Sequence, residues 1–94
     1  MIKVSVLYPN GDDATFDIDY YASTHMDIVR RTLDPAKIEI DHGMDGPYIA
    51  AGHLYFDDEA TMAAAMGNGE EAMADIANFT NITPVSQISS VRDG

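Results

Sequence analysis

The clearest pattern in this chain is an apolar stripe between Phe16 and Leu33. Apolar side chains recur there at the i, i+3, i+4, i+7 spacing of one helix face. The stripe consists of Ile18, Tyr21, Ala22, His25, Ile28, Val29, Thr32 and Leu33. Asp17 can cap the first turn through its carboxylate, and Asp34-Pro35 ends the helix because proline has no backbone N–H to donate. The pattern predicts one amphipathic helix over residues 16–33, with a histidine in its apolar face.

Four further segments carry the patterns of strands. Residues 2–8 alternate with the period of two that is typical of a strand, and residues 38–41 do so with one polar face, as at a sheet edge. Residues 48–56 are apolar enough for a central strand. Residues 80–91 form the last predicted strand, in which Pro84 indicates an edge or a bulge.

Two more helical segments are predicted between the last two strands. Asp57 or Asp58 can cap a helix over residues 59–66, and Gly67 fits the position after its end. Asn68 can cap the next segment, with Glu71 three residues later as in a capping box. We expect the buried side of both segments to be formed by Met62, Ala65, Met66, Met73 and Ile76.

This order of elements predicts an α+β fold. The sequence β-α-β-β-α-β is the ferredoxin-like arrangement, in which two helices cover one face of a four-stranded antiparallel sheet. The uncovered face would carry an apolar patch of Leu7, Ile49, Tyr55, Val85 and Val91. Such patches usually mark interfaces, and a single domain of 94 residues gains stability from pairing. We therefore expect a homodimer joined face to face, a dimeric α/β barrel.

Composition excludes several classes of function. The 16 Asp and Glu residues outnumber the 5 Lys and Arg residues, so the net charge is −11 and nucleic acid is not an expected partner. No apolar run approaches the roughly 18 residues of a membrane span, and no secretory signal opens the sequence. We expect a cytoplasmic protein with no membrane partner. Cysteine is absent, histidines lack metal-ligand spacing and no glycine-rich phosphate loop follows a strand, so we expect neither a metal nor a cofactor.

His25 is the first candidate for chemistry. Imidazole titrates near neutral pH, and Tyr21 lies beside it on the same helix face, four residues earlier. Tyr8 can approach the pair from the first strand. An imidazole with phenol neighbours in an apolar cleft can move a proton to or from a carbonyl compound. The stripe carries no carboxylate, so we expect burial to keep the ring neutral near pH 7. The alternative is a core histidine that bonds a backbone carbonyl or a tyrosine hydroxyl.

The remaining candidates are aromatic residues and a second histidine. Tyr8, Tyr48 and Phe79 would suit the wall of a pocket that binds an apolar or aromatic ligand, although ordinary core packing is the alternative. His53 should point into the dimer interface, away from His25, because it shares a strand face with Ile49. His42 is expected in an exposed loop.

Several segments together resemble the EthD family, which is named for ethyl tert-butyl ether degradation. They are residues 4–9, Phe16-Asp17 with Tyr20-Tyr21, and residues 24–26, 52–56, 73–76 and 78–82. The resemblance covers nearly the whole chain and implies the dimeric α/β-barrel superfamily, which includes small monooxygenases, lactone isomerases and polyketide cyclases. Similar sequences often have proline where this chain has Asp27 and Ala77. The missing proline at position 27 predicts a straighter helix near His25.

The resemblance does not specify one reaction, because this fold hosts many. Our first hypothesis is an EthD-like protein of an oxidative degradation pathway. It would bind, and convert without a cofactor, a small apolar carbonyl or phenolic compound, with His25 moving a proton and Tyr21 and Tyr8 orienting it. The second is a non-catalytic accessory or ligand-binding dimer that supports a monooxygenase system. The third is a structural dimer whose partner is another protein. The residues do not decide whether the chain is an enzyme.

Overall fold

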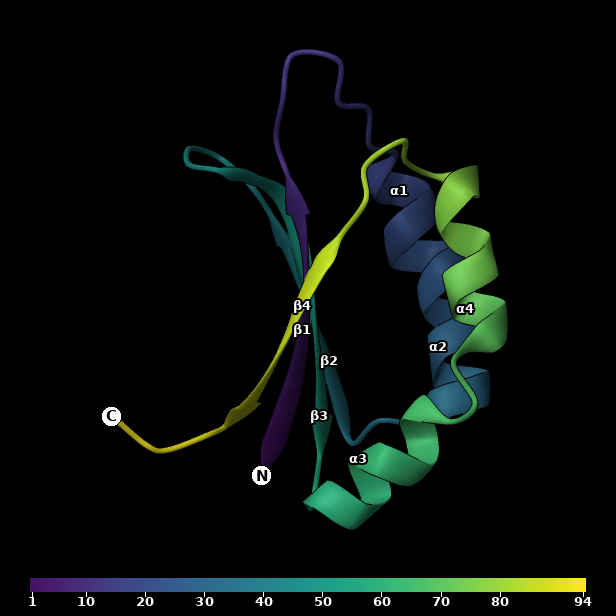
Figure 1. The fold of residues 1–94 in the computed structure, drawn as a ribbon, viewed down its shortest axis with the longest axis vertical. Helices are drawn as coiled ribbons and strands as arrows, with labels where there is room; N and C mark the ends of the chain where they lie inside the picture. The colour runs from purple at the N-terminus through teal and green to yellow at the C-terminus, as the bar shows by residue number, and fades with distance from the viewer.

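The computed structural model describes residues 1–94 and contains a four-stranded antiparallel sheet with the strand order β2-β3-β1-β4. The strands are β1 (Ile2–Pro9), β2 (Lys37–His42), β3 (Tyr48–Phe56) and β4 (Val85–Ser90). All helical segments lie on one side of this sheet (Figure 1). The predicted α+β, ferredoxin-like fold is confirmed, with β3 in a central position and β2 at an edge.

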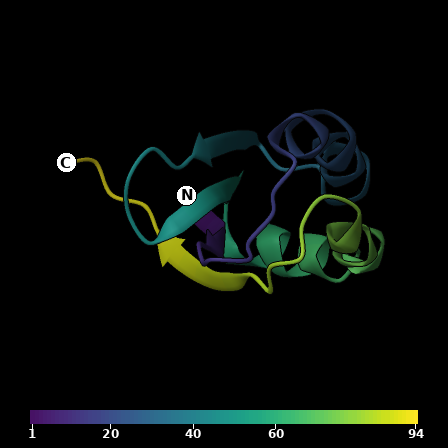
Figure 2. The same cartoon turned by 90° about the horizontal axis from the view of Figure 1, so that it is seen from above.

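Alternation along β1 decides which side chains meet the helices. Val4 pairs with Leu54 and Tyr8 with Ala50, and these four residues are buried in the core on the helix side. The alternate residues Ser5 and Leu7 point to the opposite face, which no helix covers. Figure 2, which views the fold from above, shows the helices gathered beside the sheet and the other face open.

The helical segment after β1 has three parts. They are α1 (Ile18–Tyr20), a π-helical turn (Tyr21–His25) and α2 (Met26–Leu33). Asp17 caps α1 as predicted, by accepting a hydrogen bond from the Tyr20 N–H. The Met26 N–H reaches back to the Tyr21 carbonyl, five residues earlier. A π turn thus interrupts the single helix that the apolar stripe predicted, and such turns are frequent at functional sites. The straighter helix expected from the missing proline stays a prediction.

The second helical layer consists of α3 (Glu59–Met66), α4 (Glu70–Asp75) and a 3₁₀ turn (Ile76–Asn78). Asp58 caps α3 by accepting from the Thr61 N–H, as predicted. The predicted cap at Asn68 was wrong, because the chain makes a further turn and α4 begins after Gly69 without a side-chain cap. No helix in the structure combines the length and the apolar character that crossing a bilayer requires.

The predicted buried side of this layer needs correction. Ala65, Ala72 and Asp75 are buried, whereas Met66 is 40% exposed and Met73 is 71% exposed. The reason is that α4 packs beside α2 and turns Ala72 and Asp75 inward, which leaves Met73 at the outer edge. On α4 the carboxylate of Asp75 thus faces the interior, whereas Met73, which the apolar pattern placed there, faces outward.

The last strand is shorter than predicted. It begins at Val85, and Thr80 forms only an isolated bridge with Phe16. The segment before β4 is instead fastened to the loop before α1: the Thr80 hydroxyl donates to the Thr15 carbonyl at 2.6 Å, and the Asn81 side chain accepts from the Thr15 N–H at 2.9 Å. These side-chain bonds replace the strand pairing that residues 80–84 would otherwise make.

Candidate functional site

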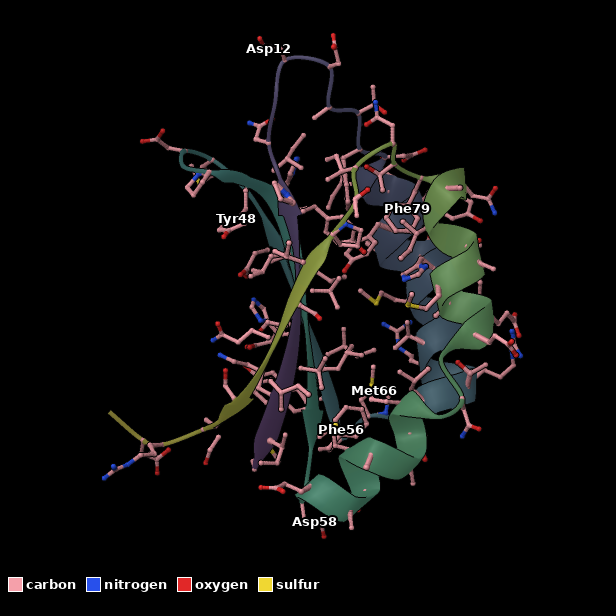
Figure 3. All side chains as sticks on the ribbon, viewed as in Figure 1. Asp12, Tyr48, Phe56, Asp58, Met66 and Phe79 are labelled. Atoms are coloured by element: carbon pink, nitrogen blue, oxygen red, sulfur yellow. The ribbon has the colours of Figure 1, made fainter.

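A cavity of about 650 Å³ lies between the helices and the sheet. Its walls come from β1, β3 and β4 on one side and from α2, α3 and α4 on the other. Thirteen of the 20 lining residues are hydrophobic, and the volume falls in the range of small-molecule sites. In Figure 3 Phe79 and Met66 lie near opposite ends of the space between the two layers. The fold thus provides an apolar chamber of ligand size.

His25 is buried and lines this cavity beside a carboxylate. Its Nδ1 atom lies 3.0 Å from Oδ2 of Asp75. The other carboxylate oxygen accepts hydrogen bonds from the Tyr20 hydroxyl at 2.8 Å and from the Asn78 amide at 2.9 Å. Because an ionised carboxylate only accepts hydrogen bonds, Nδ1 carries the proton of the neutral imidazole. The lone pair of Nε2 is left free to act as a base.

The partners of Asp75 keep it ionised. Burial alone would raise its pKa, but the hydrogen bonds from Asn78, His25 and Tyr20 together outweigh burial and hold the pKa of Asp75 below its ordinary value. The expectation that no carboxylate faces His25 was therefore wrong. The partner comes from α4, 50 residues away along the chain, and the stripe of one helix could not reveal it.

Two tyrosines complete the polar end of the cavity. The Tyr21 ring stacks on the His25 ring with 5.3 Å between centroids and 13° between planes. The centroid of the Tyr8 ring lies 5.5 Å from that of the Tyr21 ring. Burial raises the pKa of Tyr8 to about 12, an effect that the Tyr21 hydroxyl partly offsets. Burial and the neighbouring Tyr8 raise the pKa of Tyr21 further. Both phenols are therefore neutral hydrogen-bonding groups at physiological pH.

Gly52 on β3 makes room for Tyr21. A Cβ atom at this position would lie 2.0 Å from the Tyr21 hydroxyl oxygen and 3.2 Å from Cε of Met26. Any side chain at position 52 would therefore displace the Tyr21 phenol from its place above the sheet. Gly52 belongs to the motif that the sequence singled out, although the reason for the glycine is visible only in the structure.

The remaining predicted ligand-binding residues differ in position. Phe79 is buried against the His25 ring, at 4.7 Å between centroids, and supports the site from behind without lining the cavity. The structure does not bring Tyr48 to the cavity, because this residue is 40% exposed at the start of β3 (Figure 3). Of the predicted site residues, His25, Tyr21 and Tyr8 come together.

The residues that sequence reasoning missed are Asp75, Asn78, Tyr20 and Gly52. Each lies within a segment that carries the family resemblance, and that was the one available signal. The residue patterns gave no sign that Asp75 is buried, because aspartate usually lies on a solvated surface.

The open face of the sheet holds a second histidine. His53 Nδ1 lies 2.8 Å from the Ser5 hydroxyl, and its Nε2 lies 2.8 Å from Oδ2 of Asp41. As predicted, it points away from His25. His42, expected in a loop, is the exposed last residue of β2. No group of three or more His, Asp or Glu side chains is arranged to hold a metal ion.

Comparison with known proteins identifies the family. No family model matches the chain. A solved EthD-like protein from Ralstonia eutropha JMP134 is 37% identical, with a TM-score of 0.85 over 94% of this chain and 88% of the other. This chain belongs to the EthD-like family. A solved EthD family protein from Bacillus halodurans shares the fold at 18% identity, with a TM-score of 0.76 over 98% of this chain and 99% of the other.

Two further relatives widen this picture. An uncharacterized 11.0 kDa protein in the thcB-thcC intergenic region of Rhodococcus erythropolis is 32% identical over 89 residues, which span 86% of this EthD-like chain and 85% of that protein. SnoaB, a cofactor-independent oxygenase from Streptomyces nogalater, matches with a TM-score of 0.66 over 99% of this chain and 93% of the other. At 8% identity this last likeness shows the fold alone.

Proposed function

We propose that this EthD-like protein binds a small apolar carbonyl or phenolic compound in the cavity and converts it by proton transfer, without a cofactor, in an oxidative degradation pathway. The observation that carries the proposal is the buried pair of His25 and Asp75, with Nε2 free on an apolar cavity wall. A histidine held by a carboxylate in this way is a general base of the kind found in many enzymes.

In this proposal each group has a role. Asp75 accepts the Nδ1–H and fixes the ring, so that Nε2 takes a proton from a phenolic O–H or from a C–H next to a carbonyl. The imidazolium that forms is stabilised by the Asp75 carboxylate. The neutral hydroxyls of Tyr8 and Tyr21 donate hydrogen bonds to the ligand oxygen on which negative charge develops. The imidazolium then returns the proton to a different atom of the ligand, as in enolisation of a ketone, so the product is an isomer of the ligand and the protein is unchanged.

We propose further that the protein acts as a homodimer joined through the open sheet face. Leu7 and Ile49 lie on this face, and Val85 is 48% exposed there. The polar groups of the face are paired within the chain: His53 bonds Ser5 and Asp41, and the Tyr55 hydroxyl bonds Glu39. A second copy can cover such groups without leaving them unsatisfied.

The second candidate is a non-catalytic carrier, which the mainly apolar lining of the cavity also fits. The two are separated by α-hydrogen exchange of 2-tetralone, an apolar enolisable ketone, followed by NMR in deuterium oxide. A catalyst exchanges the ketone faster than buffer, and His25→Gln lowers that rate by about 100-fold, within the usual range for a general base, with little change in ketone affinity. His42→Gln, at an exposed position, serves as the control. If the protein binds 2-tetralone but does not exchange its α-hydrogens faster than buffer does, the carrier is the supported function.

A further inference from the structure

The buried polar groups of the cavity gather at one end. Tyr8, Tyr21 and His25 form one cluster, and the lining continues from there along two walls. On the helix wall, the eight residue steps from His25 to Leu33 correspond to a rise of about 12 Å. On the sheet wall, the four residue steps from Tyr8 to Val4 correspond to a length of about 13 Å. The length of both walls therefore indicates a chamber that is longer than a single aromatic ring.

The far end of this chamber is apolar. Val4 and Leu54 are register partners on the sheet, Leu33 faces them from the end of α2, and all three are buried core residues that line the cavity. Ser86 and Glu70 also contribute to the lining, but both are exposed at the rim. A ligand that fills the chamber thus meets hydrogen-bonding groups with one end and hydrocarbon with the other.

No cationic side chain lines the cavity. Arg30 and Arg31 pair with acidic residues on the outer helix surface, and Lys37 pairs with Glu39. An anion that entered would lose its hydration without a counter-ion, which is costly. The lining group that can carry positive charge is His25, and in the proposed reaction the ligand supplies that proton. The acid that reacts must therefore enter uncharged.

The chamber is accessible along β4. Ile88 lines the cavity and is 60% exposed, because α4 stands opposite β4 without covering it. Met73 is the exposed residue at the α4 side of this opening. An elongated molecule can therefore enter sideways, and it need not pass end-on through a narrow neck.

We infer that the site takes uncharged, elongated weak acids: molecules with one phenolic or enolisable group beside His25 and an apolar tail that runs toward Leu33 and Leu54. The position of the acidic group rests on the proposed function. The tail and the absence of charge rest on the shape and the lining of the cavity.

The test is binding of 4-alkylphenols of increasing chain length, from methyl to nonyl, measured by calorimetry at pH 7. Affinity should rise about fourfold for each added methylene, the factor that corresponds to ~0.8 kcal/mol of burial, until the tail reaches the far end. Decanoate, of similar length but anionic, should bind at least 100-fold more weakly than 4-heptylphenol. Affinities that do not depend on chain length, or equal binding of decanoate, would overturn the inference.

A variant locates the tail. Ala72→Leu adds volume to the cavity wall and should weaken 4-heptylphenol about tenfold while leaving 4-methylphenol within twofold. Ala74→Leu, at an exposed position on the same helix, should change neither. Equal weakening of both phenols by Ala72→Leu would place the tail elsewhere. If Ala72→Leu does not fold, Ile88→Trp at the exposed opening makes the same comparison.

Failure of this inference and failure of the proposed function give different results. If phenol affinity rises with chain length but the protein does not speed ketone exchange, the elongated ligand is supported and the catalytic role is contradicted. If the protein speeds ketone exchange but phenol affinity does not change with chain length, the proton transfer is supported and the apolar tail is contradicted. His25→Gln should retain the chain-length dependence, because that substitution alters the polar end alone.

Discussion

The Oδ2 atom of Asp75 lies 3.0 Å from Nδ1 of His25, and this contact joins two helical segments that are 50 residues apart in the chain. Both side chains are buried, and the same carboxylate also binds the Tyr20 hydroxyl and the Asn78 amide. Three donors on one acceptor fix the orientation of the carboxylate. The imidazole is in turn held with its second nitrogen free, which makes Asp75 the residue that positions the proposed base.

Asp75→Asn should therefore lower the rate of 2-tetralone exchange about 100-fold, because an amide neither stabilises imidazolium nor holds the Nδ1-protonated tautomer. Affinity for 4-methylphenol should change less than threefold. Ring ¹⁵N chemical shifts of His25 should show the tautomer moving away from Nδ1–H. Glu71→Gln, at an exposed position on the same helix, is the control. An unchanged tautomer and an unchanged exchange rate would contradict the positioning role.

The Asp75 carboxylate also makes the stability of the fold depend on pH in the acid range. Since the pKa of Asp75 is lowered in the fold, its contribution is present above the unfolded pKa of about 3.9 and is lost as pH falls through the folded pKa. Urea unfolding from pH 5 to pH 2.5 should show a smaller loss of stability for Asp75→Asn than for the unmodified chain. Part of the loss should remain, because Glu39, Asp58 and Glu71 also have lowered pKa values. An equal loss of stability with falling pH in both proteins would contradict this role of Asp75.

The fold was readable from the sequence because its elements are set by local periodicity. The period of two in β1 placed Val4 and Tyr8 on the helix side, and the apolar stripe placed His25 beside Tyr21. Asp17 and Asp58 marked helix starts through short-range hydrogen bonds. Patterns of this kind act within one element, and for that reason they are visible in one sequence.

The site was only half readable for the same reason. Asp75 reaches His25 through the packing of α4 against the first helical segment, and no spacing along the chain encodes that contact. Met73 was assigned to the interior because methionine is apolar, yet the orientation of α4 gives the interior position to Asp75. The π turn depends on backbone geometry and left no pattern in the residues.

Gly52→Ala should destabilise the protein by about 1–3 kcal/mol, the usual cost of overpacking, because its Cβ would lie 2.0 Å from the Tyr21 hydroxyl oxygen. Urea unfolding measures the loss. Gly11→Ala is the control, since a Cβ there meets nothing within 4 Å. Combining Gly52→Ala with Tyr21→Phe should recover part of the loss, because the hydroxyl that clashes is gone. A double variant as unstable as the sum of the two single variants would show that the hydroxyl is not the obstacle.

Ile49→Lys should prevent the proposed homodimer, because a lysine on the open face would be buried without a partner. Light scattering at micromolar concentration should show a dimer for the unmodified chain and a monomer or aggregate for the variant. Ala74→Lys adds the same charge to the exposed helix surface and should remain dimeric. A monomeric unmodified chain would remove the homodimer from the proposal.

Tyr8 should make the fold sensitive to alkali. Burial raises its pKa from 10.0 to about 12, so its contribution is intact below pH 10 and is lost as pH rises toward 12. A shift of this size corresponds to about 2–3 kcal/mol. Guanidinium unfolding at pH 9 and pH 11.5 should show a smaller alkaline loss for Tyr8→Phe than for the unmodified chain. Part of the loss should persist, since the pKa of buried Tyr21 is also raised. Tyr48→Phe, at a half-exposed position, should behave like the unmodified chain, and equal losses in all three proteins would mean that the Tyr8 hydroxyl is open to solvent.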